Sequence, residues 1–238
     1  MELSVQNLSR GLGETVRRLV ALLGRCPRIA LLWTLLLLSF SGAPASAADV
    51  DYYVLTLSWS PTYCVEEGRD DRAQCAPGRR FGFVVHGLWP QHARGWPEFC
   101  DTRERWVPDE RIRDMLPIMP SKRLIIHEWR KHGTCSGLSQ DEYFGLTQRL
   151  FEKVRIPARY LSPTALVSVS PGQLADDFVK SNAWLDHGMI AVDCGNRRDR
   201  ARLQEIKICF SPDGEPTRCG ANERQQCRAS TIQMPPVR

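Results

Sequence analysis

The chain has 238 residues, of which 42% are hydrophobic and 25% charged, and its formal net charge is +5. A chain of this length and composition can build one domain with a sizeable hydrophobic core. The excess of positive charge is too small for a strong nonspecific nucleic-acid binder, and much of it lies in the first 47 residues.

Those 47 residues have the pattern of a signal peptide. Arginines between Arg10 and Arg28 precede an apolar run over 29–40, and small residues follow at 45–47. This order is typical of a secretory leader, and the apolar run is shorter than the roughly 20 residues of a membrane span. We expect cleavage after Ala47 or Ala48, export to the periplasm or the extracellular medium, and no stable membrane association afterwards.

The cysteines agree with export. Nine cysteines occur in the chain and one of them, Cys26, belongs to the leader, so eight remain. An even number in an exported chain predicts disulfides rather than catalytic thiols or a zinc site. Eight cysteines allow about a hundred pairings, so their spacing alone does not give the connectivity.

Apolar patterning and turn residues predict the elements that follow the leader. In chain order we expect a strand over 54–59, a loop over 64–78, a strand over 81–88, a loop over 92–105 and a short helix over 108–115. Helices are then expected from Ser121 to Gly133, from Ser139 to Val154 and over 172–181, and strands over 189–192 and 205–210. This order predicts an α+β fold, with a central antiparallel sheet and several packed helices, in a single disulfide-bonded domain over 48–238.

Nine residues that begin at His127 read His-Glu-Trp-Arg-Lys-His-Gly-Thr-Cys. On a helix that turns roughly 100° per residue, Glu128, Lys131 and His132 fall within about 140° of His127. Trp129 falls on the other side and is free to pack. One helix face therefore gathers groups that can transfer protons or hold an anion, which indicates a catalytic face.

A zinc hydrolase is the first alternative for this segment. The zinc-binding pattern His-Glu-x-x-His places its histidines four residues apart, on one side of a helix. His127 and His132 are five residues apart, which separates them by about 140°. This spacing argues against a zinc site, and we expect no metal site. We also expect no cofactor.

A second candidate, His86, lies in the predicted strand over 81–88. A histidine on an apolar strand is more often a structural core residue than a catalyst, because one face of a strand is buried. Gly87 leaves room beside the imidazole, however, and Trp89 follows at the end of the strand. The indole can stack on a nucleobase or pack in the core.

Together the two segments resemble the signature motifs of the ribonuclease T2 family. His-Gly-Leu-Trp-Pro starts at His86, and His-Glu-Trp-x-Lys-His-Gly-Thr-Cys starts 41 positions later at His127. The resemblance extends from Trp59-Ser-Pro near the start to Gln-Glu-Ile-Lys-Ile-Cys over 204–209 near the end. It covers essentially all of the chain after the leader.

The resemblance implies an α+β enzyme that cleaves single-stranded RNA without metal through a 2′,3′-cyclic phosphate to 3′-phosphate ends. Nothing in the sequence suggests more than a monomer. It implies that His86 is the general acid for the leaving 5′-oxygen and that His132 is the general base for the 2′-hydroxyl. His127 would hold the phosphate, while Glu128 and Lys131 would stabilise the pentacoordinate phosphorus. Imidazole, with a pKa of about 6.5, suits both proton-transfer roles.

Substrate binding would fall to Trp89 and Gln91. Gln91 stands where many members of the family carry an aspartate, so no base preference follows from the resemblance. Trp96 is either a second aromatic of the base pocket or a loop-packing residue. His92 and His187 lie outside the motifs, and we expect them to be surface or structural residues.

The resemblance also implies four disulfides, which join Cys64 to Cys75, Cys100 to Cys135, Cys194 to Cys227, and Cys209 to Cys219. A secreted RNA-binding or cytotoxic protein that acts independently of catalysis is the remaining alternative. The intact set of His86, Glu128 and His132 favours the enzyme.

Overall fold

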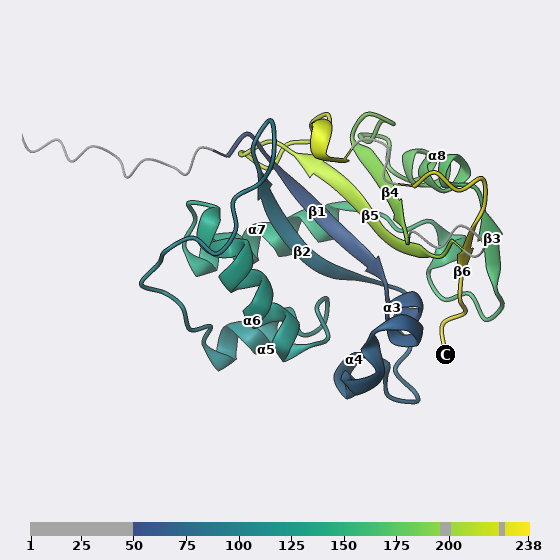
Figure 1. The fold of residues 1–238 in the computed structure, drawn as a ribbon, viewed down its shortest axis with the longest axis horizontal. Helices are drawn as coiled ribbons and strands as arrows, with labels where there is room; N and C mark the ends of the chain where they lie inside the picture. The colour runs from purple at the N-terminus through teal and green to yellow at the C-terminus, as the bar shows by residue number, and fades with distance from the viewer. Residues whose placement is uncertain (1–49, 196–200, 224–226) are drawn as a thin grey trace, which may run out of the picture. The chain divides into compact units, whose positions relative to one another are not determined.

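The structure, a computed structural model, describes residues 50–195, 201–223 and 227–238, and the expected leader lies outside them. The main sheet is antiparallel and its strand order is β2-β1-β5-β4 (Figure 1). Its strands are β1 (Tyr52–Trp59), β2 (Phe83–Gln91), β4 (Ile190–Cys194) and β5 (Leu203–Phe210). A smaller sheet pairs β3 (Val167–Val169) with β6 (Ile232–Met234).

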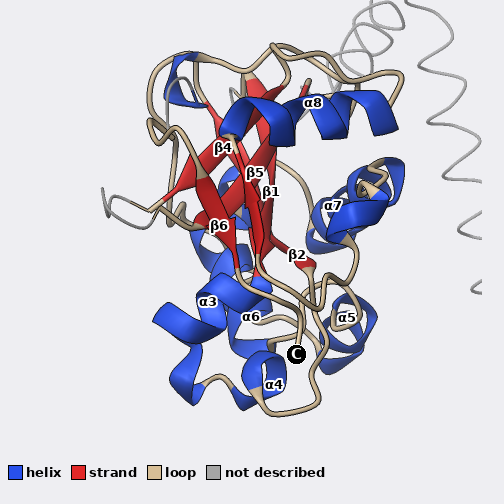
Figure 2. Cartoon of the chain, turned by 90° about the vertical axis from the view of Figure 1, so that its right-hand side faces the viewer, coloured by secondary structure: helices blue, strands red, loops and turns tan. Residues whose placement is uncertain are grey.

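Helices connect these strands and cover the sheet. They are α3 (Ser60–Glu66), α4 (Arg72–Cys75), α5 (Asp109–Met115), α6 (Lys122–Lys131), α7 (Gln140–Lys153) and α8 (Pro171–Ser181). Short 3-10 turns cover Gly68–Asp70, Gly133–Cys135, Ala158–Tyr160 and Ala221–Glu223. Both α7 and α8 lie on the same side of the main sheet (Figure 2). The predicted α+β fold is confirmed.

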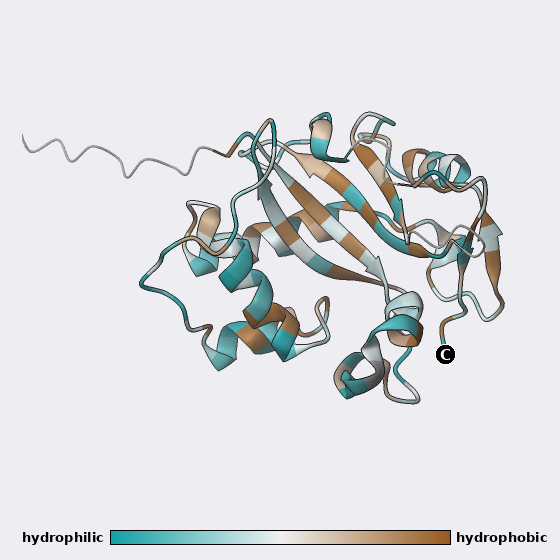
Figure 3. Ribbon diagram, in the orientation of Figure 1, coloured by the Kyte–Doolittle hydropathy of each residue, from teal (hydrophilic) through white to brown (hydrophobic). Residues whose placement is uncertain are grey.

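The two faces of the main sheet differ in polarity. One face is part of the hydrophobic core, where Leu57, Ile206 and Ile208 pack with residues of α7 and α8. On the opposite face Thr56 lies between Gly87 of β2 and Lys207 of β5. Hydrophilic bands interrupt the hydrophobic colour of the strands in Figure 3. Since side chains alternate between faces, the polar residues of β5 gather on the face away from the core.

A β-bulge places His86 on this polar face. Thr56 pairs with Gly87 whereas Leu57 pairs with Val85, so His86 is the extra residue on β2. Without the bulge, the alternation through Trp89 and Gly87 would direct His86 toward the core. Bulges change the direction of a side chain in this way, often beside active sites. The core interpretation of His86 is therefore wrong.

The prediction of a loop over residues 64–78 is also wrong. Helix α3 starts with Pro61 in its first turn, runs through the start of that range, and is followed by α4. The polar composition of the segment gave no sign of these short helices, which the disulfide between Cys64 and Cys75 joins. The three-residue strands β3 and β6 were not predicted, because segments so short carry little pattern.

Most predicted boundaries agree with the structure to within a few residues. Among these differences, β2 extends to Gln91 rather than to Leu88, and α6 ends at Lys131 rather than at Gly133. His132 is thus the residue that caps α6, and a 3-10 turn follows it. None of the helices in the described residues has the length and hydropathy of a membrane span.

The four disulfides are the pairs that the resemblance implied. They join Cys64 to Cys75, Cys100 to Cys135, Cys194 to Cys227, and Cys209 to Cys219. The bridge between Cys100 and Cys135 ties the loop after β2 to the turn that follows His132. It therefore restrains the end of α6, where the candidate base lies.

Candidate active site

Two of the predicted site residues, His86 and His132, lie on either side of the carboxylate of a third, Glu128. Glu128 is 1% exposed, and its Oε1 lies 3.6 Å from His86 Nε2. Its Oε2 lies 4.0 Å from His132 Nε2. Both separations exceed hydrogen-bonding distance. The strand β2 and the end of α6 thus place two imidazoles on either side of Glu128.

Trp89 contacts both Glu128 and His132. Its indole Nε1 donates a hydrogen bond of 2.8 Å to Glu128 Oε2, and its ring stacks on His132 with centroids 5.2 Å apart. Gly87 is required beside it, because a Cβ at that position would lie 2.0 Å from Glu128 Oε2. The spacing Gly87-x-Trp89 therefore has a steric reason that the sequence alone does not reveal.

His86 has a second carboxylate partner that the sequence analysis did not identify. Its Nδ1 lies 2.5 Å from Glu205 Oε1 of β5. Lys207 Nζ lies 3.5 Å from Glu205 Oε2 and 3.2 Å from Asp193 Oδ2 of β4. The available signal was the pair Glu205 and Lys207, two charged residues with period 2 in an otherwise apolar strand.

His127 and Lys131 lie on the turns of α6 next to Glu128. Lys131 Nζ is 3.6 Å from Glu98 Oε2, and the His127 ring packs edge-on against Phe99 with centroids 6.3 Å apart. Both side chains line the cavity described below. The structure therefore brings together all five residues that were predicted for catalysis.

A cavity of about 300 Å³ contains the site. It is lined by His86, Trp89, Gln91, Trp96, His127, Glu128, Lys131, His132, Lys207, Asn222 and Glu223. Its volume is at the lower end of the range for ligand sites, roughly 300–1,000 Å³. A second cavity, of about 600 Å³, opens on the other side of His86 and is lined there by Ser58, Tyr63 and Glu205, among other residues.

The predicted base-binding residues line the first cavity in different ways. Gln91 is buried, and its Oε1 accepts a hydrogen bond of 3.1 Å from Asn222 Nδ2. Trp96 lines the cavity although 55% of it is exposed, so it is not a loop-packing residue. Asn222 also donates to the backbone carbonyl of His92, whose side chain does not line this cavity.

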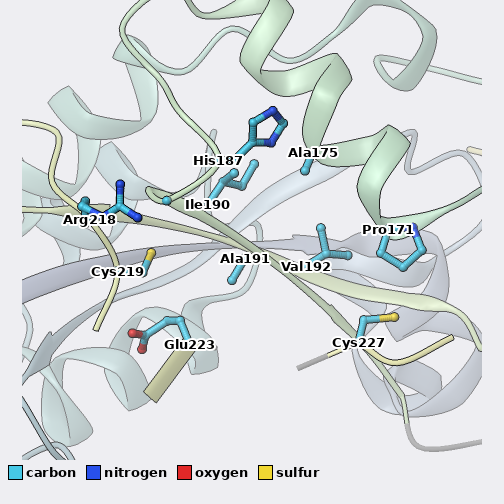
Figure 4. Close-up of a pocket in the computed structure, with 11 residues that line it drawn as sticks. Pro171, Ala175, His187, Ile190, Ala191, Val192, Arg218, Cys219, Glu223 and Cys227 are labelled. Carbon is cyan, nitrogen blue, oxygen red and sulfur yellow. The ribbon is translucent and has the colours of Figure 1, made fainter. Parts of the chain in front are cut away.

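His187 lies away from this site. It lines a cavity of about 580 Å³ beside β4, shown in Figure 4 with Arg218. Its Nε2 is 3.4 Å from Asp176 Oδ1, and its side chain is largely exposed. His187 is a surface residue, as predicted.

The surroundings displace the pKa values of the two flanking imidazoles in opposite directions. Burial by itself lowers the pKa of His86, but the hydrogen bond to Glu205 and the charges of Glu128 and Glu205 outweigh it, so that the pKa is raised above 6.5. Burial, Lys131 and the other two imidazoles lower the pKa of His132 to about 3. Its Nδ1 is buried with no hydrogen-bond partner among the described residues, so charging the ring would leave an unsatisfied donor.

Burial and the same charges also shift the pKa values of Glu128, Glu205 and His127. Burial raises the pKa of Glu128 against the opposing effects of His86 and the Trp89 hydrogen bond. Burial also favours a higher pKa for Glu205, but His86 and Lys207 together lower it. Burial and the charge of Lys131 lower the pKa of His127. Two proton-transfer groups whose pKa values are driven apart are typical of an acid and base pair.

Comparisons with known proteins agree with this site. The model of the ribonuclease T2 family matches residues 50–219. A ribonuclease from Aeromonas hydrophila is 37% identical over 188 residues, which cover 77% of this chain and 82% of the relative. Ribonuclease I from Escherichia coli K12 is 28% identical over an alignment that covers 82% of this chain and 90% of the relative.

Solved structures share the fold. An RNase-related protein from Calystegia sepium matches with a TM-score of 0.63 and 23% identity, covering 79% of this chain and 98% of that one. The self-incompatibility-associated SF11-RNase from Nicotiana alata matches with a TM-score of 0.61 and 20% identity, covering 80% and 100%. The chain belongs to the ribonuclease T2 family and is a ribonuclease T2-type endoribonuclease.

Proposed function

We propose that the protein cleaves single-stranded RNA without a metal, by transphosphorylation to a 2′,3′-cyclic phosphate that it then hydrolyses to a 3′-phosphate end. The observation that carries this proposal is the pair of imidazoles on either side of one buried carboxylate. His86 and His132 each lie within 4.0 Å of the same buried carboxylate. One ring is suited to donate a proton in the pH range where the other is suited to accept one.

In the first step, neutral His132 accepts the proton of the 2′-hydroxyl, and the 2′-oxygen attacks the phosphorus. The bond between phosphorus and the 5′-oxygen breaks, and His86 protonates the departing oxygen from Nε2. The two histidines exchange roles in the second step. His86 takes a proton from water as the water oxygen attacks the phosphorus of the cyclic phosphate. The bond between phosphorus and the 2′-oxygen breaks, and His132 returns a proton to the 2′-oxygen. The nucleophile belongs to the substrate, so DNA cannot react.

The remaining residues suit the charge that develops at phosphorus. His127, Glu128 and Lys131 line the cavity. His127 would hold the phosphate, and Glu128 and Lys131 would stabilise the pentacoordinate phosphorus. A fixed ammonium close to the growing negative charge stabilises the transition state most where water is excluded. Trp89 and Trp96 present indole rings to the same cavity, where a base can stack, and Gln91 offers an amide beside them.

The decisive experiment uses a defined RNA dinucleotide and its 2′-deoxy analogue. The RNA should yield a 2′,3′-cyclic phosphate and then a 3′-phosphate, and the deoxy compound should stay intact. His86→Ala and His132→Ala should each reduce kcat by about 10²–10⁴-fold, the usual contribution of a positioned proton-transfer group. Cleavage of the deoxy analogue, or full activity in both variants, would contradict the proposal.

We also propose that residues 1–47 are a signal peptide and that residues 48–238 form the exported, monomeric enzyme. The four disulfides support this assignment, because disulfides persist in oxidising compartments. N-terminal sequencing of the protein recovered from periplasm and medium would identify the cleavage site and the compartment. Recovery of the uncleaved chain in the membrane fraction, or of a dimer by light scattering, would overturn the corresponding part.

A further inference from the structure

A row of four charged or titratable side chains crosses the polar face of the main sheet. It runs from Asp193 on β4 through Lys207 and Glu205 on β5 to His86 on β2. Three of these residues have no part in the proposed proton transfers. Glu205 and Lys207 are nevertheless largely buried, with side chains 14% and 10% exposed. Removing charged groups from water costs free energy even when they are paired, so a buried charged network at this place needs a functional explanation.

The geometry shows which carboxylate holds His86. Glu205 Oε1 lies 2.5 Å from Nδ1, within hydrogen-bonding distance. Glu128 Oε1 lies 3.6 Å from Nε2, beyond that distance, and Glu128 Oε2 accepts from Trp89 instead. The two ring nitrogens therefore have different environments. One is bound to β5, whereas the other faces Glu128 and the cavity.

We propose that Glu205 is the positioning residue of the general acid: it accepts the hydrogen of His86 Nδ1 and so directs the transferable proton on Nε2 toward the leaving 5′-oxygen. This inference rests on the proposed function. When the bond between phosphorus and the 5′-oxygen breaks, the proton moves from Nε2 to that oxygen and His86 becomes neutral. Glu205 keeps its negative charge throughout and takes no proton.

Lys207 has the complementary task of holding Glu205 in place. Its ammonium bridges Glu205 and Asp193, and it also lies 5.3 Å from the centre of the Trp89 ring. A carboxylate restrained on one oxygen by an ammonium presents its other oxygen in a fixed direction. Positioned catalytic groups need such support, because a misplacement of about 1 Å can cost roughly 10²-fold in rate.

The charged groups around His86 shift its pKa in opposite directions. Glu128 from α6 and Glu205 from β5 favour its protonated form, and Lys207 from β5 opposes it. The positive charge of His86 lowers the pKa values of His127 on α6 and of His132 at the end of that helix. Loss of the Glu205 charge should therefore make His86 easier to deprotonate, by about 1–3 pH units, the usual effect of one close opposite charge.

The first test compares two substrates. In Glu205→Gln, kcat on an RNA dinucleotide should fall and the alkaline limb of the profile of kcat/KM against pH should move to lower pH. A nucleoside 3′-aryl phosphate should be cleaved almost as in the unmodified protein, because its phenolate leaves without a proton. Equal losses on both substrates with an unmoved alkaline limb would show that Glu205 supports only the structure.

A matched control is Asp177→Asn on α8. Asp177 has a similarly buried side chain, 16% exposed, accepts the hydroxyl hydrogen of Tyr160 and pairs with Arg159. Its loss should lower thermal stability but leave the pH profile and the substrate ratio unchanged. A shift in the profile of this variant would mean that destabilisation alone moves the limb, which would overturn the interpretation.

The second test does not depend on catalysis. The pKa of the His86 ring can be measured by NMR titration of the free protein, with the signal assigned from His86→Ala. We expect Glu205→Gln to lower this pKa and Asp177→Asn to leave it unchanged. An unchanged pKa in Glu205→Gln would refute the inference even if the protein cleaves RNA as proposed. A lowered pKa in a protein that forms no cyclic phosphate would refute only the proposed function.

Discussion

Replacement of Gly87 by alanine tests how closely the catalytic groups are packed. The new Cβ would lie 2.0 Å from Glu128 Oε2 and 2.6 Å from Trp89 Nε1, whereas ordinary contacts begin at 3.4 Å. The carboxylate must therefore move by about 1.4 Å, and it lies in a site where it is 1% exposed. That movement breaks the 2.8 Å hydrogen bond from Trp89 to Glu128.

Two magnitudes follow from this displacement. A misplacement of about 1 Å in a catalytic site can cost roughly 10²-fold, so we expect kcat on an RNA dinucleotide to fall by about that factor. Loss of a buried hydrogen bond to a charged group costs about 1.5–3 kcal/mol, which should appear in the free energy of unfolding. The assays are initial-rate kinetics and urea denaturation.

Gly172→Ala is the matched control. Gly172 lies in the first turn of α8, and a Cβ there meets nothing within 4 Å. Activity should be unchanged, and stability should be equal or slightly higher, since alanine favours a helix over glycine by up to about 1 kcal/mol. If Gly87→Ala kept full activity and full stability, the packing argument around Glu128 would be wrong.

Three further outcomes are expected. The profile of kcat/KM against pH should rise through about pH 3, where His132 loses its proton, and should fall only above pH 6.5, where His86 loses its proton. A profile with a rising limb and no falling limb would contradict the assignment of His86 as the acid. A strong chelator should leave the rate unchanged, whereas a loss of activity that zinc restores would exclude the metal-free mechanism. Replacement of Cys100 and Cys135 by serine should lower the free energy of unfolding by about 2–4 kcal/mol in urea denaturation, and an unchanged midpoint would show that this bridge carries no stability.

The face of α6 that carries the candidate site residues was predictable because helical periodicity is local. The relative directions of His127, Glu128 and Lys131 depend only on the helix, and all three line one cavity. Trp129 is buried on the other side, as the same count predicts. The length of the helix was less predictable, because its end depends on the turn after His132 and on the bridge from Cys135.

The role of His86 could not be derived from its strand alone. Alternation would place it in the core, and only the bulge against β1 directs it to the polar face. A bulge arises from the pairing of two strands, so a single strand carries no sign of it. Glu205 was hidden for a similar reason, since its partner lies 119 residues earlier in the chain.

Two local motifs suffice to identify the groups that can do the chemistry, namely the histidines, the carboxylate and the ammonium, and local patterning predicts the secondary structure that carries them. Tertiary structure alone decided which nitrogen of His86 faces the cavity, and how far the pKa values of the two imidazoles separate. The physical reason is that burial and opposing charges act through space, and the residues that supply them come from α6, β5 and β4.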